Sequence, residues 1–194
     1  DRLAGTAILI DGGTNVTVLG ATIRGYKVAI HARGTRRLTV AGHVLDHNWK
    51  PRLWSGIEHE SLVDWLSFHH NEANEWLRYG AAIYLERVDE GEIRDNVARQ
   101  GMNGLLLTRS SRLRIWNNDF SYLSGLGIGL YRTTDSTIMH NRIDWCVRGY
   151  SHAFYNRGQD SAGILMYEQS SRNVVAYNSV THGGDGIFGS LLFP

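Results

Sequence analysis

The chain has 194 residues, of which 42% are hydrophobic and 20% charged, with a formal net charge of +1. This composition is typical of a folded globular domain with a sizeable core and excludes a disordered chain. The balanced charge predicts no nucleic-acid partner, and the absence of 18 consecutive apolar residues predicts no membrane span. Cys146 is the one cysteine, so an internal disulfide is excluded. We expect a single domain over residues 1–194.

A short sequence motif recurs along the whole chain. It consists of a small residue followed by a strand-like segment with apolar residues at every second position. Most repeats are 22 or 23 residues apart, and two longer intervals of 53 and 36 residues equal one repeat plus about 31 and 13 inserted residues. The repeat predicts an all-β, right-handed parallel β-helix of about seven partial coils. Its first strands begin at Ala7, Ala29, Ala82, Gly104, Gly127, Gly163 and Gly186.

The alternation also predicts which way the side chains point. Residues such as Ile83, Leu85, Leu105 and Leu107 would face the core, because successive strand residues point to opposite faces. Their neighbours would face outward. These outward positions are His31, Tyr84, Leu106, Gly129 and Leu165 in one row, and Arg33, Glu86, Thr108, Tyr131 and Tyr167 in another.

A second marker follows each coil start by thirteen to fifteen residues. It is a glycine or asparagine at a bend, where asparagine can adopt a left-handed backbone and bond to the asparagine of the next coil. The positions are Gly20, Gly42, Asn96, Asn118, Asn141 and Asn178. The pattern predicts a stacked asparagine ladder.

Two insertions interrupt the coils, at about residues 49–80 and 149–161, and insertions are where a solenoid carries its site. The first is rich in tryptophan, including Trp54 and Trp65, and its residues 61–79 are the one stretch of the chain that shows helical periodicity. It fits a lid packed on the rod or a platform on which sugar rings stack. The adjacent His69 and His70 would point to opposite faces of a strand, which makes a shared metal ion a poor prediction.

The second insertion is dense in polar groups and precedes the coil that carries Tyr167 and Glu168. The repeat register places Asp160 near His182 and Asp185 of the next coil. Carboxylates with a nearby histidine and arginine suit acid–base chemistry on a sugar. We therefore predict acid–base groups and substrate contacts here. The acid–base and orienting candidates are Asp160, Asp185, His182, Glu168 and Arg157, and the contact candidates are Tyr150, His152, Tyr155, Asn156, Gln159, Tyr167, Trp54 and Trp65.

A simpler interpretation stands beside this one, because aspartates before serine or glycine commonly form turns. A row of Arg87, Arg109, Arg132 and Glu168 on successive coils also fits either a solvated ladder or a second place to bind acidic polysaccharide. Three adjacent arginines repel each other unless carboxylates or a bound anion intervene. The cofactor stays open, with calcium as a candidate for lyase or epimerase chemistry on a uronate.

The last coil begins at Gly186 and stops at Leu191-Leu192-Phe193-Pro194 without closing. Solenoids normally cover their end coils. We therefore expect a longer protein truncated here, or a homodimer formed through this end. The chain opens at Asp1 in strand-like sequence with no signal peptide among these residues, and we expect a secretion signal to have been removed.

The coil starts, the asparagine positions and the run from Arg148 to Gly186 resemble the pectate-lyase-like superfamily of right-handed β-helices, and more narrowly the bacterial right-handed β-helix repeat proteins. The resemblance implies a secreted or periplasmic protein. The alginate-epimerase motif Asp-Pro-His-Asp and the polygalacturonase motif Gly-His-Gly are both absent. This scaffold hosts several activities, so no family's catalytic residues carry over.

The sequence thus predicts a carbohydrate-active protein, a hydrolase or lyase acting on an extracellular polysaccharide. The alternative is a non-catalytic polysaccharide-binding or structural module.

Overall fold

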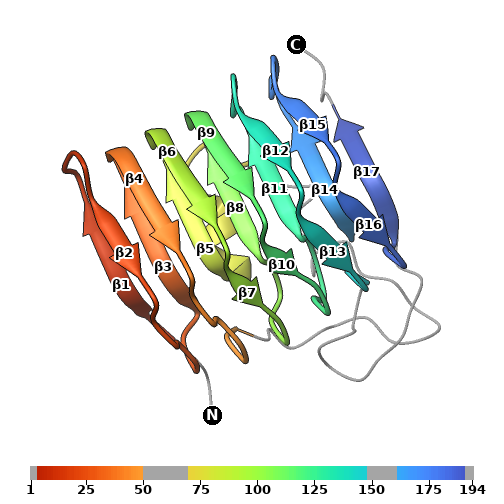
Figure 1. The fold of residues 1–194 in the computed structure, drawn as a ribbon, viewed down its shortest axis with the longest axis horizontal. Helices are drawn as coiled ribbons and strands as arrows, with labels where there is room; N and C mark the ends of the chain where they lie inside the picture. Colours follow the sequence, from red (N-terminus) through yellow and green to blue (C-terminus); the bar gives the residue numbers. More distant parts are fainter. Residues whose placement is uncertain (1–3, 50–69, 148–160, 191–194) are drawn as a thin grey trace.

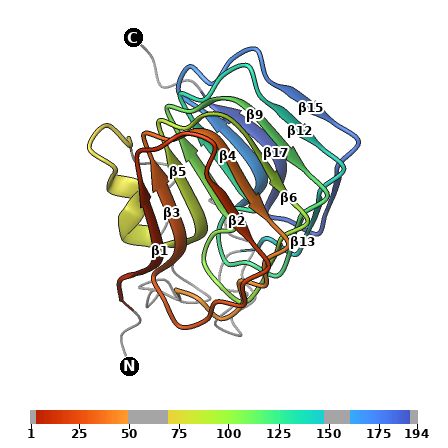
Figure 2. The ribbon, with the colours of Figure 1, turned by 60° about the vertical axis from the view of Figure 1, so that its left-hand side comes forward.

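The structure is a computed structural model that describes residues 4–49, 70–147 and 161–190. In these ranges the strands form three parallel sheets, and the chain passes from one sheet to the next as it winds (Figures 1 and 2). Connections between parallel strands of one sheet are right-handed in nearly all proteins. The predicted right-handed parallel β-helix is confirmed.

The first sheet has seven strands, in the order β1, β3, β5, β8, β11, β14 and β17. They span Thr6–Asp11, Val28–Arg33, Ala81–Glu86, Leu105–Thr108, Ile128–Tyr131, Ala162–Tyr167 and Asp185–Ser190.

The second sheet has six strands, β2, β4, β6, β9, β12 and β15. They span Thr17–Leu19, Arg36–Ala41, Asp89–Arg94, Ser111–Trp116, Thr137–Met139 and Val174–Ala176. The third sheet has four strands, β7 (Val97–Ala98), β10 (Asp119–Phe120), β13 (Arg142–Asp144) and β16 (Ser179–Thr181).

Residues one repeat apart lie over one another. Ile128 pairs with Leu105 and with Ile164, and Ile164 pairs with Ile187. The glycines before these residues therefore line up, as the repeat predicts. A Cβ atom added at Gly127 would lie 2.6 Å from the carbonyl oxygen of Gly163 and 2.4 Å from a methyl carbon of Ile143. Gly104, Gly127 and Gly163 are glycine because a side chain has no room there, whereas the earlier coils carry alanine in the same column.

The inward residues form one continuous core along the rod, which includes Ile83, Leu85, Leu105 and Leu107. The residues of the first sheet that point away from the core do not face solvent, because most of them are buried. Tyr84, Leu106 and Leu165 lie in a second apolar cluster together with Trp76. That tryptophan belongs to a short 3-10 helix, η3 (Glu75–Tyr79), at the end of the first insertion. Trp76 thus packs on the rod, as the lid interpretation of the first insertion predicts.

The asparagine ladder is confirmed at four positions. Asn96 donates from its backbone and side-chain nitrogens to the Oδ1 atom of Asn118, at 3.1 and 2.9 Å, and Asn118 bonds in the same way to Asn141. Asn141 continues the ladder to Asn178. The first two glycine positions were one residue out of register, since Ala41 pairs with Arg94 and Gly42 therefore aligns with Asp95.

His43 occupies the ladder position on the second coil, as a substitute for asparagine. Its backbone N–H donates to the Oδ1 atom of Asn96, and its Nδ1 atom accepts the backbone N–H of Ala21 at 2.9 Å. Its Nε2 atom lies 3.1 Å from the carbonyl oxygen of Val18. A backbone N–H can only donate, so Nδ1 carries no proton and the ring is neutral, with its hydrogen on Nε2.

We predict that the variant His43→Asn removes part of the loss of stability in acid. Burial lowers the pKa of His43 below the ordinary value, despite its bonds to Val18 and Ala21. Below about pH 6.5 the unfolded chain therefore binds a proton on this histidine that the folded protein does not bind. The free energy of unfolding consequently decreases as the pH falls from about 6.5 towards the lowered pKa. The loss is at most about 1.4 kcal/mol per pH unit. The asparagine side chain binds no proton in this pH range, so the variant lacks this contribution to the loss of stability.

The measurement is urea unfolding across the pH range from 7.5 down to 4.5, with exposed His47→Asn as the matched control. His31, whose pKa burial also lowers, remains in both variants. Parallel pH profiles for His43→Asn and the unchanged protein would refute the assignment.

Candidate functional site

A row of four charged side chains lies at the corner between the first and second sheets. Arg87, Arg109, Arg132 and Glu168 occupy equivalent positions there, one residue after strands that pair in register. All four have left-handed backbones, with φ between 42° and 50°. The predicted row therefore exists, with three partly exposed arginine side chains and a buried Glu168.

A carboxylate from outside the row neutralises part of the positive charge of its arginines. Glu72, in the segment that leads into η3, lies across the corner and accepts a 2.8 Å hydrogen bond from the hydroxyl of Tyr131. Its carboxylate is 2.6 Å from a guanidinium nitrogen of Arg132 and 3.4 Å from one of Arg109. Arg87 pairs with Glu86. This part of the row is a set of ion pairs, which leaves little net positive charge for an acidic polymer.

The same contacts set the protonation of Glu72 and Tyr131. The hydrogen bond from Tyr131 lowers the pKa of Glu72 most, with help from the two arginines. Burial and the bond to Glu72 together raise the pKa of Tyr131 to about 12. At neutral pH, Glu72 is therefore ionised and the Tyr131 hydroxyl keeps its proton.

Glu168 and Tyr167 lie on the next coil and are both buried, at 6% and 2% exposure. The Oε1 atom of Glu168, the hydroxyl of Tyr167 and the Nε atom of Arg132 have no hydrogen-bond partner among the described residues. Burial raises the pKa of Tyr167, so its hydroxyl is protonated at neutral pH. His70 lies beside this carboxyl group, with its Nδ1 atom 3.9 Å from Oε1. We call these residues, with Glu72, Tyr131 and Arg132, the Glu168 corner.

Trp76 forms the wall of this corner. Its ring meets Tyr131 edge-on at 5.4 Å and Tyr167 at 6.2 Å between centroids. On the side of the last coil, Glu168 and Tyr167 line a hollow of about 400 Å³ together with Gly189 and the 169–171 turn. The arrangement places the protonated Tyr167 and the buried Glu168 beside an open space.

His182 lies elsewhere, at the corner between the third and first sheets. Its Nδ1 atom is 2.8 Å from the carboxylate of Asp144, which also accepts a 2.7 Å bond from the hydroxyl of Thr181. Its ring stacks on Trp145 at 4.8 Å, and its side chain is 59% exposed. Burial raises the pKa of Asp144, but the bonds from Thr181 and His182 outweigh it, and the net pKa is lowered.

The structure separates the predicted residues into these two groups. Asp185 pairs in register with Ala162, at the start of β14, whereas Glu168 follows the end of that strand. Six residues of strand at about 3.3 Å each put roughly 20 Å between the two corners. His182 and Asp185 are thus near one another in one turn, and Glu168 and Tyr167 form a different site.

The other predicted residues lie outside the described ranges. They are Asp160, Arg157, Tyr150, His152, Tyr155, Asn156, Gln159, Trp54 and Trp65. Sequence reasoning missed Glu72, Tyr131 as a hydrogen-bond donor, and Asp144. The repeat register could have placed Asp144 beside Thr181, since these residues are paired. No periodic signal marks Glu72.

Among the described residues, no helix is long and apolar enough to cross a membrane. A family model described as "NosD: Periplasmic copper-binding protein (NosD)" matches residues 4–189. No curated protein and no solved structure matches the chain. Since the family match covers almost the whole length of the repeat, and the coils agree with it, the chain belongs to the NosD family of right-handed β-helix repeat proteins.

Proposed function

We propose that this protein acts on a polysaccharide outside the cytoplasm, through the Glu168 corner. The observation that carries the proposal is the group of three buried polar atoms, on Arg132, Tyr167 and Glu168, that lack partners in the described part of the chain. Buried polar atoms are nearly always hydrogen-bonded. Seven other buried atoms of the described residues also lack a partner, and what singles out this group is that Tyr167 and Glu168 line the hollow of about 400 Å³, where a ligand can supply the missing bonds. The hydroxyl groups of a sugar both donate and accept.

The residues suit distinct roles in breaking a glycosidic bond. Such reactions use a proton-transfer group and a second, ionised carboxylate. Glu168 is the proposed proton-transfer group, because it lies beside the hollow and its Oε1 atom is uncommitted. Glu72 stays ionised through its bonds to Tyr131 and Arg132 and can stabilise positive charge. The protonated hydroxyl of Tyr167 can orient the substrate.

The test is a screen of neutral and acidic polysaccharides, with and without added calcium, which reads reducing ends and ultraviolet absorbance. Reducing ends alone indicate a hydrolase, and absorbance from unsaturated uronates indicates a lyase. Binding without products would support the alternative of a non-catalytic binding module. Neither binding nor products across the panel would refute the proposal.

The family's description names copper, and the described residues fit a copper site only in part. The hydrogen bond that Nδ1–H of His182 donates to Asp144 is the kind of contact that orients a metal-binding imidazole. However, no group of three His, Cys, Asp or Glu residues suited to a metal occurs in the described ranges. Cys146 is fully buried, and burial raises the pKa of its thiol, which disfavours the thiolate that copper prefers. We derive no copper chemistry from these residues.

A titration with Cu(II), followed by calorimetry, belongs beside the screen. Stoichiometric binding that disappears in His182→Ala and weakens in Asp144→Asn would favour the function in the family's description over the one proposed here.

A further inference from the structure

The outer face of the second sheet carries a small hollow away from the Glu168 corner. It has a volume of about 180 Å³ and is lined by residues of β9, β12 and the turn that follows, namely Arg114, Ile115, Trp116, Thr137, Met139 and His140. Pockets for drug-sized ligands run from roughly 300 to 1,000 Å³. This hollow is therefore sized for a single ring rather than a whole cofactor.

Aromatic rings border the hollow and continue past it along the rod. Trp116 pairs in register with Met139, so the indole and the thioether lie side by side on adjacent coils. His140, at the next corner, stacks face to face on Tyr177 at 5.4 Å with an interplanar angle of 9°. Tyr177 is 79% exposed. A pair of stacked rings left open to water offers a flat apolar surface to a ligand.

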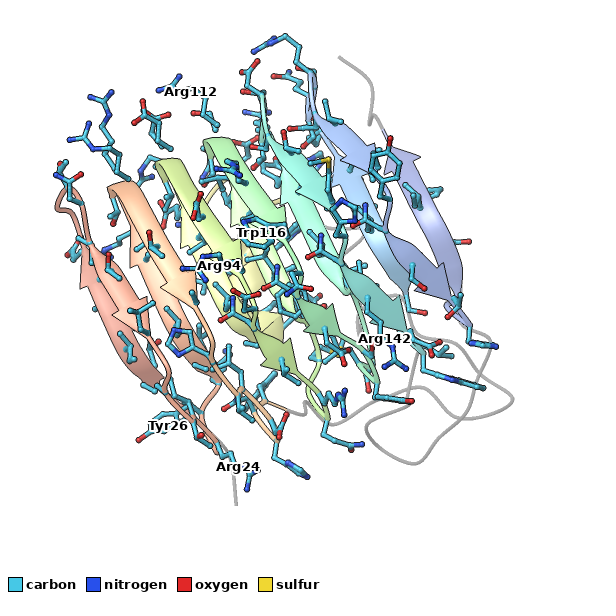
Figure 3. The ribbon with its side chains drawn as sticks, viewed as in Figure 1. Arg24, Tyr26, Arg94, Arg112, Trp116 and Arg142 are labelled. Atoms are coloured by element: carbon cyan, nitrogen blue, oxygen red, sulfur yellow. The ribbon has the colours of Figure 1, made fainter. Side chains whose placement is uncertain are left out.

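The indole of Trp116 is itself held from one side. The guanidinium of Arg94, on the preceding coil, lies 5.8 Å from the centre of the Trp116 rings, and Figure 3 shows the two residues on neighbouring strands. The residues across from Trp116 in the hollow come from the following coil. A cation over an aromatic ring stabilises its position, so the indole forms a fixed wall rather than a mobile one.

The charges around the hollow cancel. Arg114 donates to Glu92 at 2.8 Å, and Arg94 donates to Asp95 at 2.6 Å. Two guanidinium groups are thus matched by two carboxylates within direct contact. A site for a uronate or a phosphate would leave positive charge uncommitted, so this face favours a neutral ligand with an apolar ring face and hydroxyl edges.

We propose that this aromatic face, defined by Trp116, Met139, His140 and Tyr177, is a second binding site for a neutral glycan, separate from the Glu168 corner. One sugar ring enters the hollow beside Trp116, and the chain continues over the His140–Tyr177 stack. Adjacent coils are about 4.8 Å apart, so successive aromatic groups meet successive parts of an extended chain. The site holds the polymer and takes no part in bond cleavage.

The test is calorimetric binding of neutral hexasaccharides, namely cello-, manno- and xylo-oligosaccharides, with oligogalacturonate as the acidic comparison. We expect binding of at least one neutral probe to weaken about tenfold or more in Trp116→Ala and in Tyr177→Ala, a change of about 1.4 kcal/mol. The exposed position of Tyr177 makes the second variant safe for folding. Leu19→Ala is the matched control, since Leu19 lies in the Trp116 column on the first coil and is 61% exposed.

Glu168→Gln separates this inference from the proposed function. It should leave neutral-glycan binding at the aromatic face unchanged, whether or not the protein shows activity. Affinities unaltered by both aromatic substitutions, tighter binding of oligogalacturonate than of every neutral probe, or no binding of any neutral probe would overturn the inference.

Discussion

Replacing Asn118 by alanine should destabilise the protein by about 2–6 kcal/mol, a large part of the roughly 5–15 kcal/mol that holds a domain folded. The side chain of Asn118 is fully enclosed in the ladder. Its Oδ1 atom accepts two bonds from Asn96, and its Nδ2 atom donates to the Oδ1 atom of Asn141 and to the carbonyl oxygen of Ile93. Truncation leaves at least two of these buried groups without a partner, at about 1–3 kcal/mol each.

The measurement is the free energy of urea unfolding, with two comparison variants. Asn178→Ala removes the last rung, which is only partly buried and bonds to Asn141 on one side, so the loss should be smaller. Asn117→Gly removes an exposed asparagine at φ 55° while keeping its backbone accessible, and should cost no more than about 1 kcal/mol. Equal losses in Asn118→Ala and Asn117→Gly would show that the ladder does not stabilise the coils.

The sequence was sufficient for the fold because the repeat itself is the structural unit. A parallel β-helix pairs each residue with the one a coil away, so the spacing of Gly104, Gly127, Gly163 and Gly186 directly encodes the register that is observed. The ladder was predicted with a one-residue error on the first two coils. There the ladder residue is His43, which performs the two hydrogen-bonding roles of asparagine with a ring that no asparagine pattern reveals.

The site was less predictable, because its residues come from segments that do not repeat. Spacing placed Glu168 in one row with Arg132, but nothing periodic shows that Glu72 crosses the corner and pairs with Arg132. Likewise, alternation predicted that Tyr84 points away from the core, yet its burial depends on the insertion that packs Trp76 against the same face. Proximity in sequence also suggested that Glu168 and His182 share a site, while the length of β14 separates them.

Glu168→Gln should reduce the rate on the polysaccharide substrate by about 10²- to 10⁴-fold, the usual contribution of a proton-transfer group. The amide has the shape of the carboxyl group but cannot take up or release a proton at working pH. The fold should be almost unaffected. The Oε1 atom has no hydrogen bond to lose among the described residues, and its contact with His70, at 3.9 Å, is long. Unfolding free energy should therefore change by less than about 1 kcal/mol.

Tyr167→Phe completes the argument, since it deletes a buried hydroxyl that has no partner in the described part of the chain. In a purely structural corner, removing such an orphan group is neutral or stabilising, because its burial is no longer penalised. In a substrate site the same deletion raises KM or lowers kcat while the protein becomes no less stable. Asp11→Asn, an exposed carboxylate on the first coil, is the control for loss of a surface carboxylate. Full activity in both Glu168→Gln and Tyr167→Phe would show that the corner is structural, and that the unpaired atoms meet no substrate.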